Sequence, residues 1–346
     1  MAHRIAIVLA TLFTLASCAT FVAREIESSS NPYTFSASES FEKFAETLLT
    51  FDKQHCSDTW LYCFSYLYGA PEPLSESDLS FSVSLTNPAT MTFDKSLTLI
   101  SSAVPRFEGT VMLLHGFGAD KEEMRYAATY FQLLGFHVLV PGLFGRDAAS
   151  PPLSYGVKDA ELLAEFLDNQ RDTVTQPLIV VGHSMGALAA VKTATLSSQI
   201  SGLILLSPMN RFDIATVGVA KSFRPWTSIL IPDSSLKEGA KIALSNAGVD
   251  VEQTDMFDDL SSLTLPILVY GGRKDTISNI NEAAQWNMPN VTRHVVKSEN
   301  HVSTSVIDNL EHQAISTWIS ANIEPAVYLN TGDISEYNQT DSFEEK

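Results

Sequence analysis

The sequence predicts an α/β fold with a mostly parallel central sheet, helices on both faces and a small helical cap. Three observations support this prediction. From about residue 110 onward, short apolar runs alternate with helical stretches, as they do when crossover helices join parallel strands. One run, Leu178–Val181, leads through Gly182-His-Ser-Met-Gly186 directly into a stretch of good helix formers. The alternation is interrupted between residues 209 and 263, where short helical stretches replace strands.

Length and composition are those of a chain that can bury a large core. The 346 residues suffice for one large α/β domain or two smaller ones, and 45% of them are apolar. Forty acidic residues against 22 basic ones give a net charge of −18, and the acidic side chains are scattered. Such a surface cannot neutralise phosphates, so we expect no nucleic-acid partner and no electrostatic docking on anionic lipid.

The first 17 residues have the layout of an export signal. A short basic start precedes the apolar run Ile5–Leu15, which is shorter than a membrane span needs. The run ends in Leu15-Ala-Ser-Cys18, which resembles the lipobox of bacterial lipoprotein signal peptides. The resemblance implies that residues 1–17 are removed and that Cys18 becomes a lipidated first residue in the bacterial envelope. Ala19, directly after the cysteine, resembles the residue found there in lipoproteins sorted to the outer membrane, and the sequence does not decide between the periplasmic and the surface side. An ordinary cleaved signal is the alternative.

The other two cysteines, Cys56 and Cys63, remain as a pair once Cys18 is assigned to lipid. An exported chain meets oxidising conditions, so we expect a disulfide between them, with two separate thiols in a helix as the alternative. A metal site would need further ligands nearby, and only His55 offers one, so we expect none.

Residues 18–78 are expected to form a tether and a helical N-terminal extension. Up to about residue 40 the chain is rich in Ser, Asn and Glu, a composition typical of tethers. From residue 41 to 68, the spacing of Phe41, Phe44 and Leu48 indicates one apolar helix face.

The main domain is expected over residues 79–322. Alternating or continuous apolar runs predict strands at 80–85, 91–100, 110–114, 137–140, 178–181, 202–208, 265–272 and 292–296. Helical patterns are found at about 121–134, 159–169, 187–194, 280–286 and 302–322. Residues 209–263 are expected to be a cap insertion within this domain, and residues 323–346 an acidic polar tail.

The segment Gly182-His-Ser-Met-Gly186 has the form of a nucleophile elbow, G-x-S-x-G, between a strand and a helix. The glycines permit close approach of strand and helix, and the helix N-terminus favours negative charge near Ser184. A glycine turn that holds a serine by chance is the alternative, and the flanking strand and helix make it rare.

A serine at its ordinary pKa is a poor nucleophile, so it needs a base, and the base needs an acid that fixes its tautomer. In an elbow of this kind the chain order is serine, acid, histidine. Asp275 and His301 satisfy that order and lie at the carboxyl ends of strands, where open α/β sheets place their sites. Asp213, after the preceding strand, is the alternative acid. The other histidines (His55, His137, His183, His294 and His312) are expected to be structural.

Acyl transfer also needs donors for the oxyanion of the tetrahedral intermediate. The backbone N–H of Met185, directly after the nucleophile, is one candidate, and the N–H of Phe117 in the loop after residue 114 is the other. We expect His115 to shape that loop and assign it no proton transfer.

These motifs together resemble the α/β-hydrolase superfamily, and most closely its branch of monoacylglycerol lipases, lysophospholipases and serine aminopeptidases. The resemblance covers about residues 80–322 and rests on Leu114-His-Gly-Phe-Gly118, the elbow, Gly271-Gly-Arg-Lys-Asp275 and Asn300-His301, in the family's order. It implies an α/β-hydrolase fold with a cap that matches residues 209–263. The loop after Val140 lacks the usual Asp-x-x-Gly-His-Gly sequence, which leaves its shape open.

The expected function is that of a membrane-anchored serine hydrolase, a carboxylesterase or lipase, which cleaves monoacylglycerol, lysophospholipid or short to medium acyl esters. The apolar patch Trp226–Ile231 is either an acyl pocket or interfacial lid, or the core of the cap itself. Amide, peptide, thioester or C–C bond hydrolysis on the same fold remains the alternative. A non-catalytic binding protein is disfavoured by the intact triad, and an epoxide hydrolase would need aspartate in place of Ser184.

No metal or organic cofactor is implied. The expected partners are a small acyl ester or lipid substrate and a membrane, through the lipid anchor. Nothing in the sequence fixes the oligomeric state.

Overall fold

The protein is built around a sheet in which eight strands pair among the residues that the structure describes. The computed structural model describes residues 18–49, 51–57, 59, 62–74, 77–87, 92–145, 152–170, 174–278 and 280–323. The strands are β2 (Phe51–Cys56), β3 (Cys63–Gly69), β6 (Thr110–Leu114), β7 (His137–Pro141), β8 (Leu178–His183), β9 (Ile200–Leu206), β10 (Ile267–Gly272) and β11 (Val291–Val296). Their spatial order is β11-β10-β9-β8-β6-β7-β3-β2. All pairs from β11 to β7 are parallel, whereas β3 and β2 join antiparallel at one edge.

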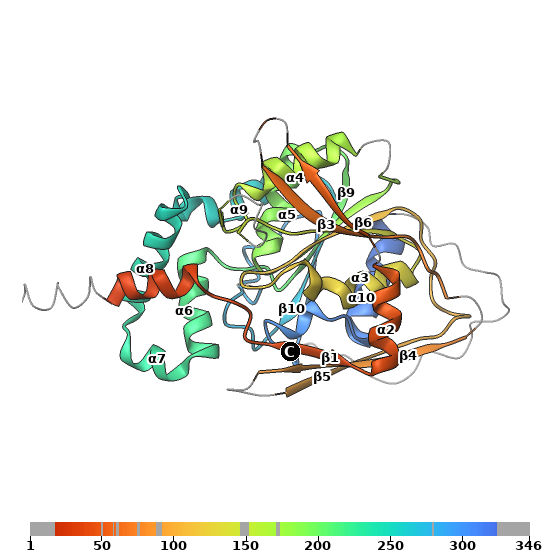
Figure 1. Ribbon diagram of the computed structural model, residues 1–346, viewed down its shortest axis with the longest axis horizontal. Helices are drawn as coiled ribbons and strands as arrows, with labels where there is room; N and C mark the ends of the chain where they lie inside the picture. Colours follow the sequence, from red (N-terminus) through yellow and green to blue (C-terminus); the bar gives the residue numbers. More distant parts are fainter. Residues whose placement is uncertain are drawn as a thin grey trace, which may run out of the picture.

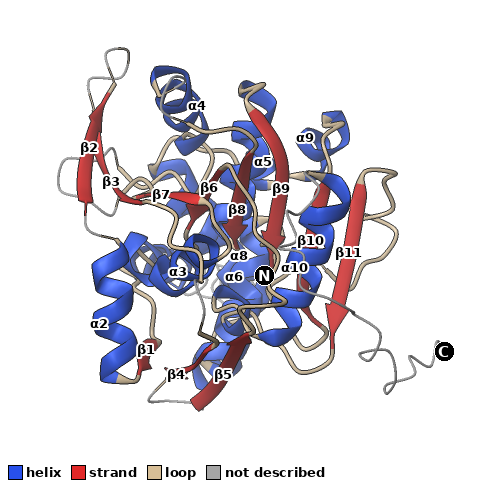
Figure 2. Cartoon of the chain, turned by 90° about the vertical axis from the view of Figure 1, so that its right-hand side faces the viewer, coloured by secondary structure: helices blue, strands red, loops and turns tan. Residues whose placement is uncertain are grey.

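The central strands are buried on both faces, which explains their continuous apolar sequences. In β8, Leu178 and Val180 belong to the core on one face of the sheet, and Ile179 and Val181 to the core on the other. The first core includes α4 (Asp159–Asn169) and α5 (Met185–Leu196), and the second includes α3 (Arg125–Leu133) and α10 (Asn309–Asn322). Figure 2 shows these helices on the two sides of the sheet. The predicted α/β class, with helices on both faces of a mostly parallel sheet, is confirmed.

Helices fill the segment between β9 and β10, where the sequence predicts short helices and no strand. They are α6 (Phe212–Phe223), α7 (Pro225–Leu230), α8 (Asp233–Asn246), the 3-10 turn η2 (Val251–Thr254) and α9 (Phe257–Ser262). Helices α6, α7 and α8 lie together at one end of the molecule (Figure 1). The side chains of Trp226, Ile229 and Leu230 on α7 are 80, 73 and 81% exposed. The interpretation of this patch as the core of the cap is therefore wrong for these three residues.

Residues 18–40, expected to be a tether, are ordered and packed. Residues 18–27 form a helix whose Ala19, Val22 and Ile26 are buried. This helix lies against α8 (Figure 1), so closely that a Cβ on Gly239 would lie 2.5 Å from the Cβ of Val22. The apolar residues recur at helical spacing, and burying them against the cap outweighs the polar composition on which the tether prediction rested.

The small second sheet also begins in this N-terminal region. In the described part of the chain, β1 (Thr34–Ala37) pairs with β4 (Leu79–Thr86), and β4 pairs with β5 (Thr92–Leu99), both antiparallel. The predicted strands at 80–85 and 91–100 thus exist, but they form this separate sheet and not part of the central one. Among the described residues, no helix is long and apolar enough to cross a membrane. The predicted signal, residues 1–17, and residues 324–346 of the predicted tail lie outside the described residues.

The helix expected over residues 41–68 is mostly wrong. Only α2 (Glu39–Leu48) forms, and the following residues make the β2–β3 hairpin. The segment 63–69 is rich in aromatic residues, which suit a strand, and it extends the central sheet beside β7. The predicted disulfide is present: Cys56 and Cys63 face each other across the hairpin and are joined.

Two of the predicted C-terminal helices also differ from the structure. Residues 281–290 form turns, because Asn281, Asn287 and Pro289 favour turns, and Trp286 is buried against Phe257 with 4.9 Å between ring centroids. The last helix begins at Asn309 and not near residue 302. It is preceded by the 3-10 turn η3 (Ser303–Ser305).

Candidate active site

The serine of the predicted elbow stands on a sharp turn between β8 and α5. Ser184 has a φ of 54°, a left-handed conformation that is strained for any residue but glycine. The two flanking glycines are required by the packing of the turn. A Cβ on Gly182 would lie 2.4 Å from the carbonyl oxygen of Gly186, and a Cβ on Gly186 would lie 2.2 Å from that of Leu114. The turn therefore fits only glycine on either side of the serine.

His301 and Asp275 meet at this serine. His301 Nε2 lies 2.7 Å from Ser184 Oγ, and His301 Nδ1 lies 2.9 Å from Asp275 Oδ2. Asp275 Oδ1 also accepts backbone N–H bonds from Ile277, at 2.9 Å, and Ser278, at 3.0 Å. Burial by itself raises the pKa of the Asp275 carboxyl, but the adjacent His301 and these hydrogen bonds outweigh it and lower the pKa to about 2. Asp275 is therefore an ionised acceptor that orients His301 with Nε2 toward the serine.

His183, expected to pack only, also holds the histidine loop. Its Nε2–H donates to the backbone carbonyl of His301 at 2.8 Å. Burial, with the adjacent His301, lowers the pKa of His183 to about 4, so its ring is neutral at pH 7 and can donate this bond. Sequence reasoning missed this contact because the bond joins residues that are far apart in the chain.

The structure places both predicted oxyanion donors beside Ser184. Met185 is the first residue of α5, and helix geometry leaves its N–H without an acceptor inside the helix. Phe117 lies in the loop after β6 and lines the cavity at Ser184. Its ring packs against those of Tyr155 and Phe212, with centroids 5.9 and 5.6 Å away. Their role as donors stays a prediction.

His115 braces the loop that contains Phe117. Its Nε2 accepts the backbone N–H of Leu143 at 3.0 Å, and its Nδ1 lies 3.0 Å from the carbonyl oxygen of Gly116. Its ring is fully buried and joins the loop after β6 to the loop after β7. These contacts agree with the structural role expected for it.

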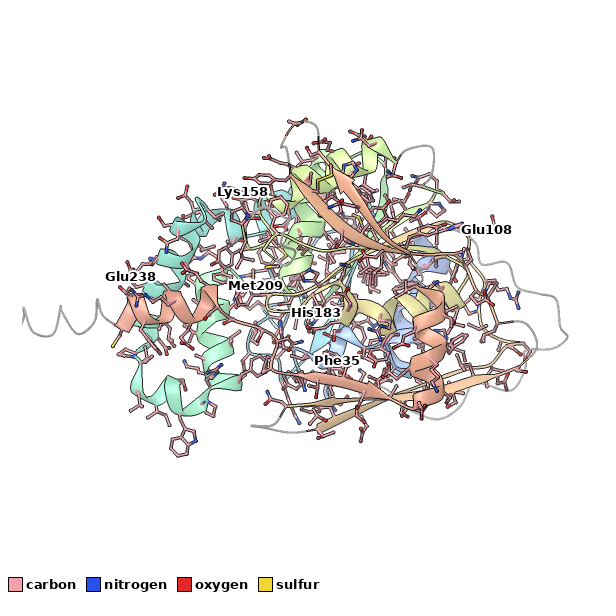
Figure 3. All side chains as sticks on the ribbon, in the orientation of Figure 1. Phe35, Glu108, Lys158, His183, Met209 and Glu238 are labelled. Atoms are coloured by element: carbon pink, nitrogen blue, oxygen red, sulfur yellow. A yellow bond between two sulfur atoms is a disulfide. The ribbon has the colours of Figure 1, made fainter. Side chains whose placement is uncertain are left out.

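A cavity of about 170 Å³ opens at Ser184 and is mostly apolar. Its apolar lining comes from the N-terminal region, the stretch after β6, the cap and the stretches after β10 and β11. It includes Ile26, Phe35, Phe117, Met124, Met209, Phe212, Ala215, Val219, Phe223, Ile277 and Val302. Figure 3 labels His183, Met209 and Phe35, which line the cavity between the cap and the sheet. Glu123 and Arg224 add charged groups to the lining. The mostly apolar lining suits an apolar group bound beside Ser184.

Other candidate residues lie away from this constellation. Asp213, the alternative acid, is in the first turn of α6, where Arg211 binds it with nitrogen–oxygen distances of 2.7 and 3.0 Å. His312 lies 3.0 Å from the hydroxyl of Tyr130, and His137 lies 2.9 Å from that of Tyr68. These three groups therefore have structural partners.

Three carboxylates, those of Glu299, Asp308 and Glu311, come together in a geometry that could suit a cation. The ammonium of Lys95 already lies among them, 2.7 to 3.1 Å from each. We therefore assign no metal to this cluster. Cys18 is a free thiol in the helix formed by residues 18–27, and its lipidation stays a prediction.

The sequence is similar to known hydrolases over part of its length. Residues 105–255 match the family model described as "Serine aminopeptidase, S33". Phospholipase YtpA of Bacillus subtilis is 23% identical over 155 residues, which make up 43% of this chain and 60% of that protein. Epoxide hydrolase srdG of Neurospora crassa is 28% identical over 97 residues, 27% of this chain and 28% of that protein. The matches thus span less than two thirds of either relative.

Solved structures resemble the chain over more of its length. The esterase Pf2001 of Pyrococcus furiosus has a TM-score of 0.53 at 16% identity, covering 81% of this chain and 95% of the esterase. A bacterial membrane phospholipase A, described as a virulence factor, also has a TM-score of 0.53, at 18% identity, covering 93% of this chain and 99% of the phospholipase. A thermophilic esterase from Thermogutta terrifontis has 0.50 at 19% identity, covering 79% and 99%. At these identities the likeness shows a shared fold.

Proposed function

We propose that this chain, whose fold is that of the α/β-hydrolases, cleaves carboxylic esters through an acyl-enzyme on Ser184. One observation carries the proposal. The hydrogen-bonded series Asp275–His301–Ser184, with distances of 2.9 and 2.7 Å, lies at a mostly apolar cavity. The nucleophile, the base and the acid that orients the base are thus in contact before any substrate arrives.

The reaction follows from this geometry. Ser184 Oγ attacks the ester carbonyl carbon while His301 Nε2 takes the hydroxyl proton, and the ionised Asp275 stabilises the resulting imidazolium. The N–H groups of Met185 and Phe117 would donate to the oxyanion. Collapse of the tetrahedral intermediate breaks the bond to the alcohol, whose oxygen takes the proton from His301. A water molecule then gives a proton to His301 and attacks the acyl carbon, and collapse releases the carboxylic acid and returns the proton to Ser184.

The substrate class we propose is a single-chain acyl ester: monoacylglycerol, lysophospholipid or a short to medium acyl ester. The apolar side chains around the cavity can hold an acyl chain, and burial of apolar surface there contributes about 25 cal/mol per Å². The esterases among the similar structures and the phospholipase among the curated relatives support an ester as the scissile group.

We also propose that Cys18 anchors the enzyme to a bacterial membrane, the outer membrane being the one that the sequence favours. Cys18 lies in the helix formed by residues 18–27, which is at the end of the molecule where the cap lies (Figure 1). The exposed Trp226, Ile229 and Leu230 belong to the same cap. Apolar side chains on a surface helix suit the boundary of a bilayer.

A second candidate function is hydrolysis of an amide or peptide bond, favoured by the description of the matching family as serine aminopeptidase. The same acyl-enzyme chemistry serves both bonds, and the leaving group is then an amine. The two functions separate in the experiment that follows.

The test is hydrolysis of p-nitrophenyl esters with acyl chains from acetyl to palmitoyl, beside aminoacyl p-nitroanilides, by the detergent-solubilised full chain and Ser184→Ala. We expect ester hydrolysis with a preferred chain length and its loss in the variant. Cleavage of anilides but not esters would favour the second function. Ester hydrolysis that survives in Ser184→Ala would contradict the proposal.

A further inference from the structure

The segment 28–33, here called the strap, joins the helix on the cap to β1 (Figure 1). Residues 29–32 all line the cavity at Ser184, together with Phe117 and Gly118. At its end, the ring of Tyr33 packs edge-on against Phe223 of α6, with 5.7 Å between centroids. A segment expected to be a tether is therefore one wall of the catalytic cavity.

Asn31 is the point at which the strap is fixed to the protein. Its backbone N–H donates to the carbonyl oxygen of Gly118 at 2.8 Å. Its side-chain amide Nδ2 donates to the carboxylate of Glu123, and its Oδ1 accepts the N–H of Tyr33 at 3.1 Å. The approach to Gly118 is close: a Cβ there would lie 3.1 Å from the nitrogen of Asn31, and Gly118 has a φ of +82°.

The two partners of Asn31 bracket the loop that contains the predicted oxyanion donor. Gly118 directly follows Phe117, and Glu123 belongs to the 3-10 turn η1 (Lys121–Met124), to which that loop leads. The loop contains Gly116 and Gly118, and glycine leaves a backbone many conformations. An oxyanion donor, however, must be held within about 0.5 Å of its working position. The bonds from Asn31 supply this restraint from outside the loop.

We propose that Asn31 is a positioning residue, which holds the loop at 116–120 so that the N–H of Phe117 can donate to the oxyanion. The inference rests on the proposed function. It makes the N-terminal segment a working part of the active site. The same segment then connects the proposed membrane anchor to the catalytic loop.

The amide–carboxylate pair of Asn31 and Glu123 allows a test by exchange. In Asn31→Asp two carboxylates face each other, whereas in Asn31→Asp with Glu123→Gln the amide and the carboxylate change places and the bond returns. Asp keeps the oxygen that accepts from Tyr33. Asn246→Ala is the matched control. Asn246 of α8 makes the same kind of bond, since its Nδ2 donates to Oε1 of Glu27 in the N-terminal region at 2.7 Å, but neither residue lines the cavity.

The measurement is kcat and KM of the full chain for p-nitrophenyl butyrate, with the thermal midpoint of each variant. We expect Asn31→Ala to lower kcat about tenfold to a hundredfold while KM changes little, since a misplaced group about 1 Å away costs on this order. In Asn31→Asp, kcat should fall at least as far. The double exchange should restore most of that lost kcat. Asn246→Ala should leave kcat unchanged.

Two results would overturn the proposal: an unchanged kcat in Asn31→Ala, or a double exchange no more active than Asn31→Asp alone. The exchange remains decisive even where Asn31→Ala unfolds, because its members differ by a restored bond. Ser184→Ala, measured alongside, separates the two claims. Activity that survives in it removes the proposed function, whereas an inactive Ser184→Ala with indifferent Asn31 variants removes only this inference.

Discussion

Two parts of the chain contribute to the site in different ways. One runs from β6 to α10 and is here called the catalytic part, because it contains the proposed triad. The other, residues 18–99, is here called the N-terminal part. In the first part, Ser184, Asp275 and His301 each come just after a strand of the central sheet, at the same edge. In the second part, the residues that matter act through contacts with distant sequence, as Asn31 does with Gly118. Chemistry at strand ends is therefore visible in local sequence, whereas support from outside is visible only in the fold.

Lys95 gives a second example of support from the N-terminal part. It lies in β5 with 5% of its side chain exposed, and its Nζ is 2.8 Å from Glu299, 3.1 Å from Asp308 and 2.7 Å from Glu311. Burial by itself lowers the pKa of Lys95, but the charges of Glu311, Glu299 and Asp308 outweigh it and raise the pKa. The ammonium thus stays charged in the interior.

The partners of Lys95 lead to the histidine loop. Glu299 precedes Asn300 and His301, and its carboxylate also accepts the hydroxyl of Ser303. The N-terminal part therefore contacts the surroundings of Ser184 twice, through Asn31 at the loop of Gly118 and through Lys95 at the loop of His301.

The largest effect expected in the catalytic part is that of Asp275→Asn. The amide would favour the wrong tautomer of His301, so kcat should fall roughly 10⁴-fold. The free energy of unfolding should change far less than the activation free energy, because asparagine has nearly the same shape as aspartate. Ester hydrolysis and urea unfolding of the same preparation measure both. A kcat within tenfold of the wild type would show that Asp275 does not orient the base.

Lys95 in the N-terminal part should respond differently, with stability and activity lost together. Lys95→Met leaves buried carboxylates without their cation, and breaking a buried ion pair costs about 3–5 kcal/mol. The histidine loop should shift as well, lowering kcat. Urea unfolding measures the first effect. Lys43→Met is the matched control, since the exposed Lys43–Glu39 pair contributes at most about 1 kcal/mol. Equal losses in both variants would contradict a special role for Lys95.

The disulfide tests the β2–β3 hairpin, which lies at one edge of the central sheet. Cys56→Ser with Cys63→Ser removes a short closed loop, which in the chain-entropy account costs about 2.5 kcal/mol of unfolding free energy. The kcat should stay unchanged, because neither cysteine lines the cavity. Reduction of the wild type should give the same loss of stability. A fall in kcat would mean that the hairpin contributes to the site.

The smallest expected effect is a pH dependence of the free energy of unfolding. It comes from His312 in α10, away from Ser184. Burial lowers the pKa of His312 to about 4, so below pH 6.5 the unfolded chain binds a proton that the folded chain does not. Stability therefore falls as the pH drops from 6.5 toward 4. Between pH 7 and 5 the wild type should lose about 2 kcal/mol more than His312→Gln, which keeps an acceptor for Tyr130. Equal losses in urea unfolding would contradict this assignment.

The sequence predicts that Ser184, Asp275 and His301 meet, because each of their signals is local. The strand, turn and helix around Ser184 occupy consecutive residues, and Asp275 and His301 follow apolar runs that are themselves strands. Asp213 could be separated from Asp275 only by the fold, which pairs the former with Arg211.

The N-terminal part resisted prediction because its partners lie far away in the chain. The first helix has its small apolar residues at the right spacing, but only the presence of α8 makes their burial favourable. Lys95 follows a strand pattern as an ordinary lysine would, and its burial depends on carboxylates about 200 residues later. Asn31 sits in a Ser- and Asn-rich stretch that composition assigns to a tether, and its bond to Gly118 leaves no mark in local sequence.

The central claim, that Ser184 is the nucleophile of an ester hydrolase, is tested most directly by labelling the full chain with a fluorophosphonate. The adduct is mapped by mass spectrometry while hydrolysis of p-nitrophenyl butyrate is followed in the same samples. We predict a single adduct, on Ser184, whose occupancy rises in step with the loss of hydrolysis. Hydrolysis that persists in fully labelled protein, or an adduct on another residue that accompanies the loss, would contradict the claim.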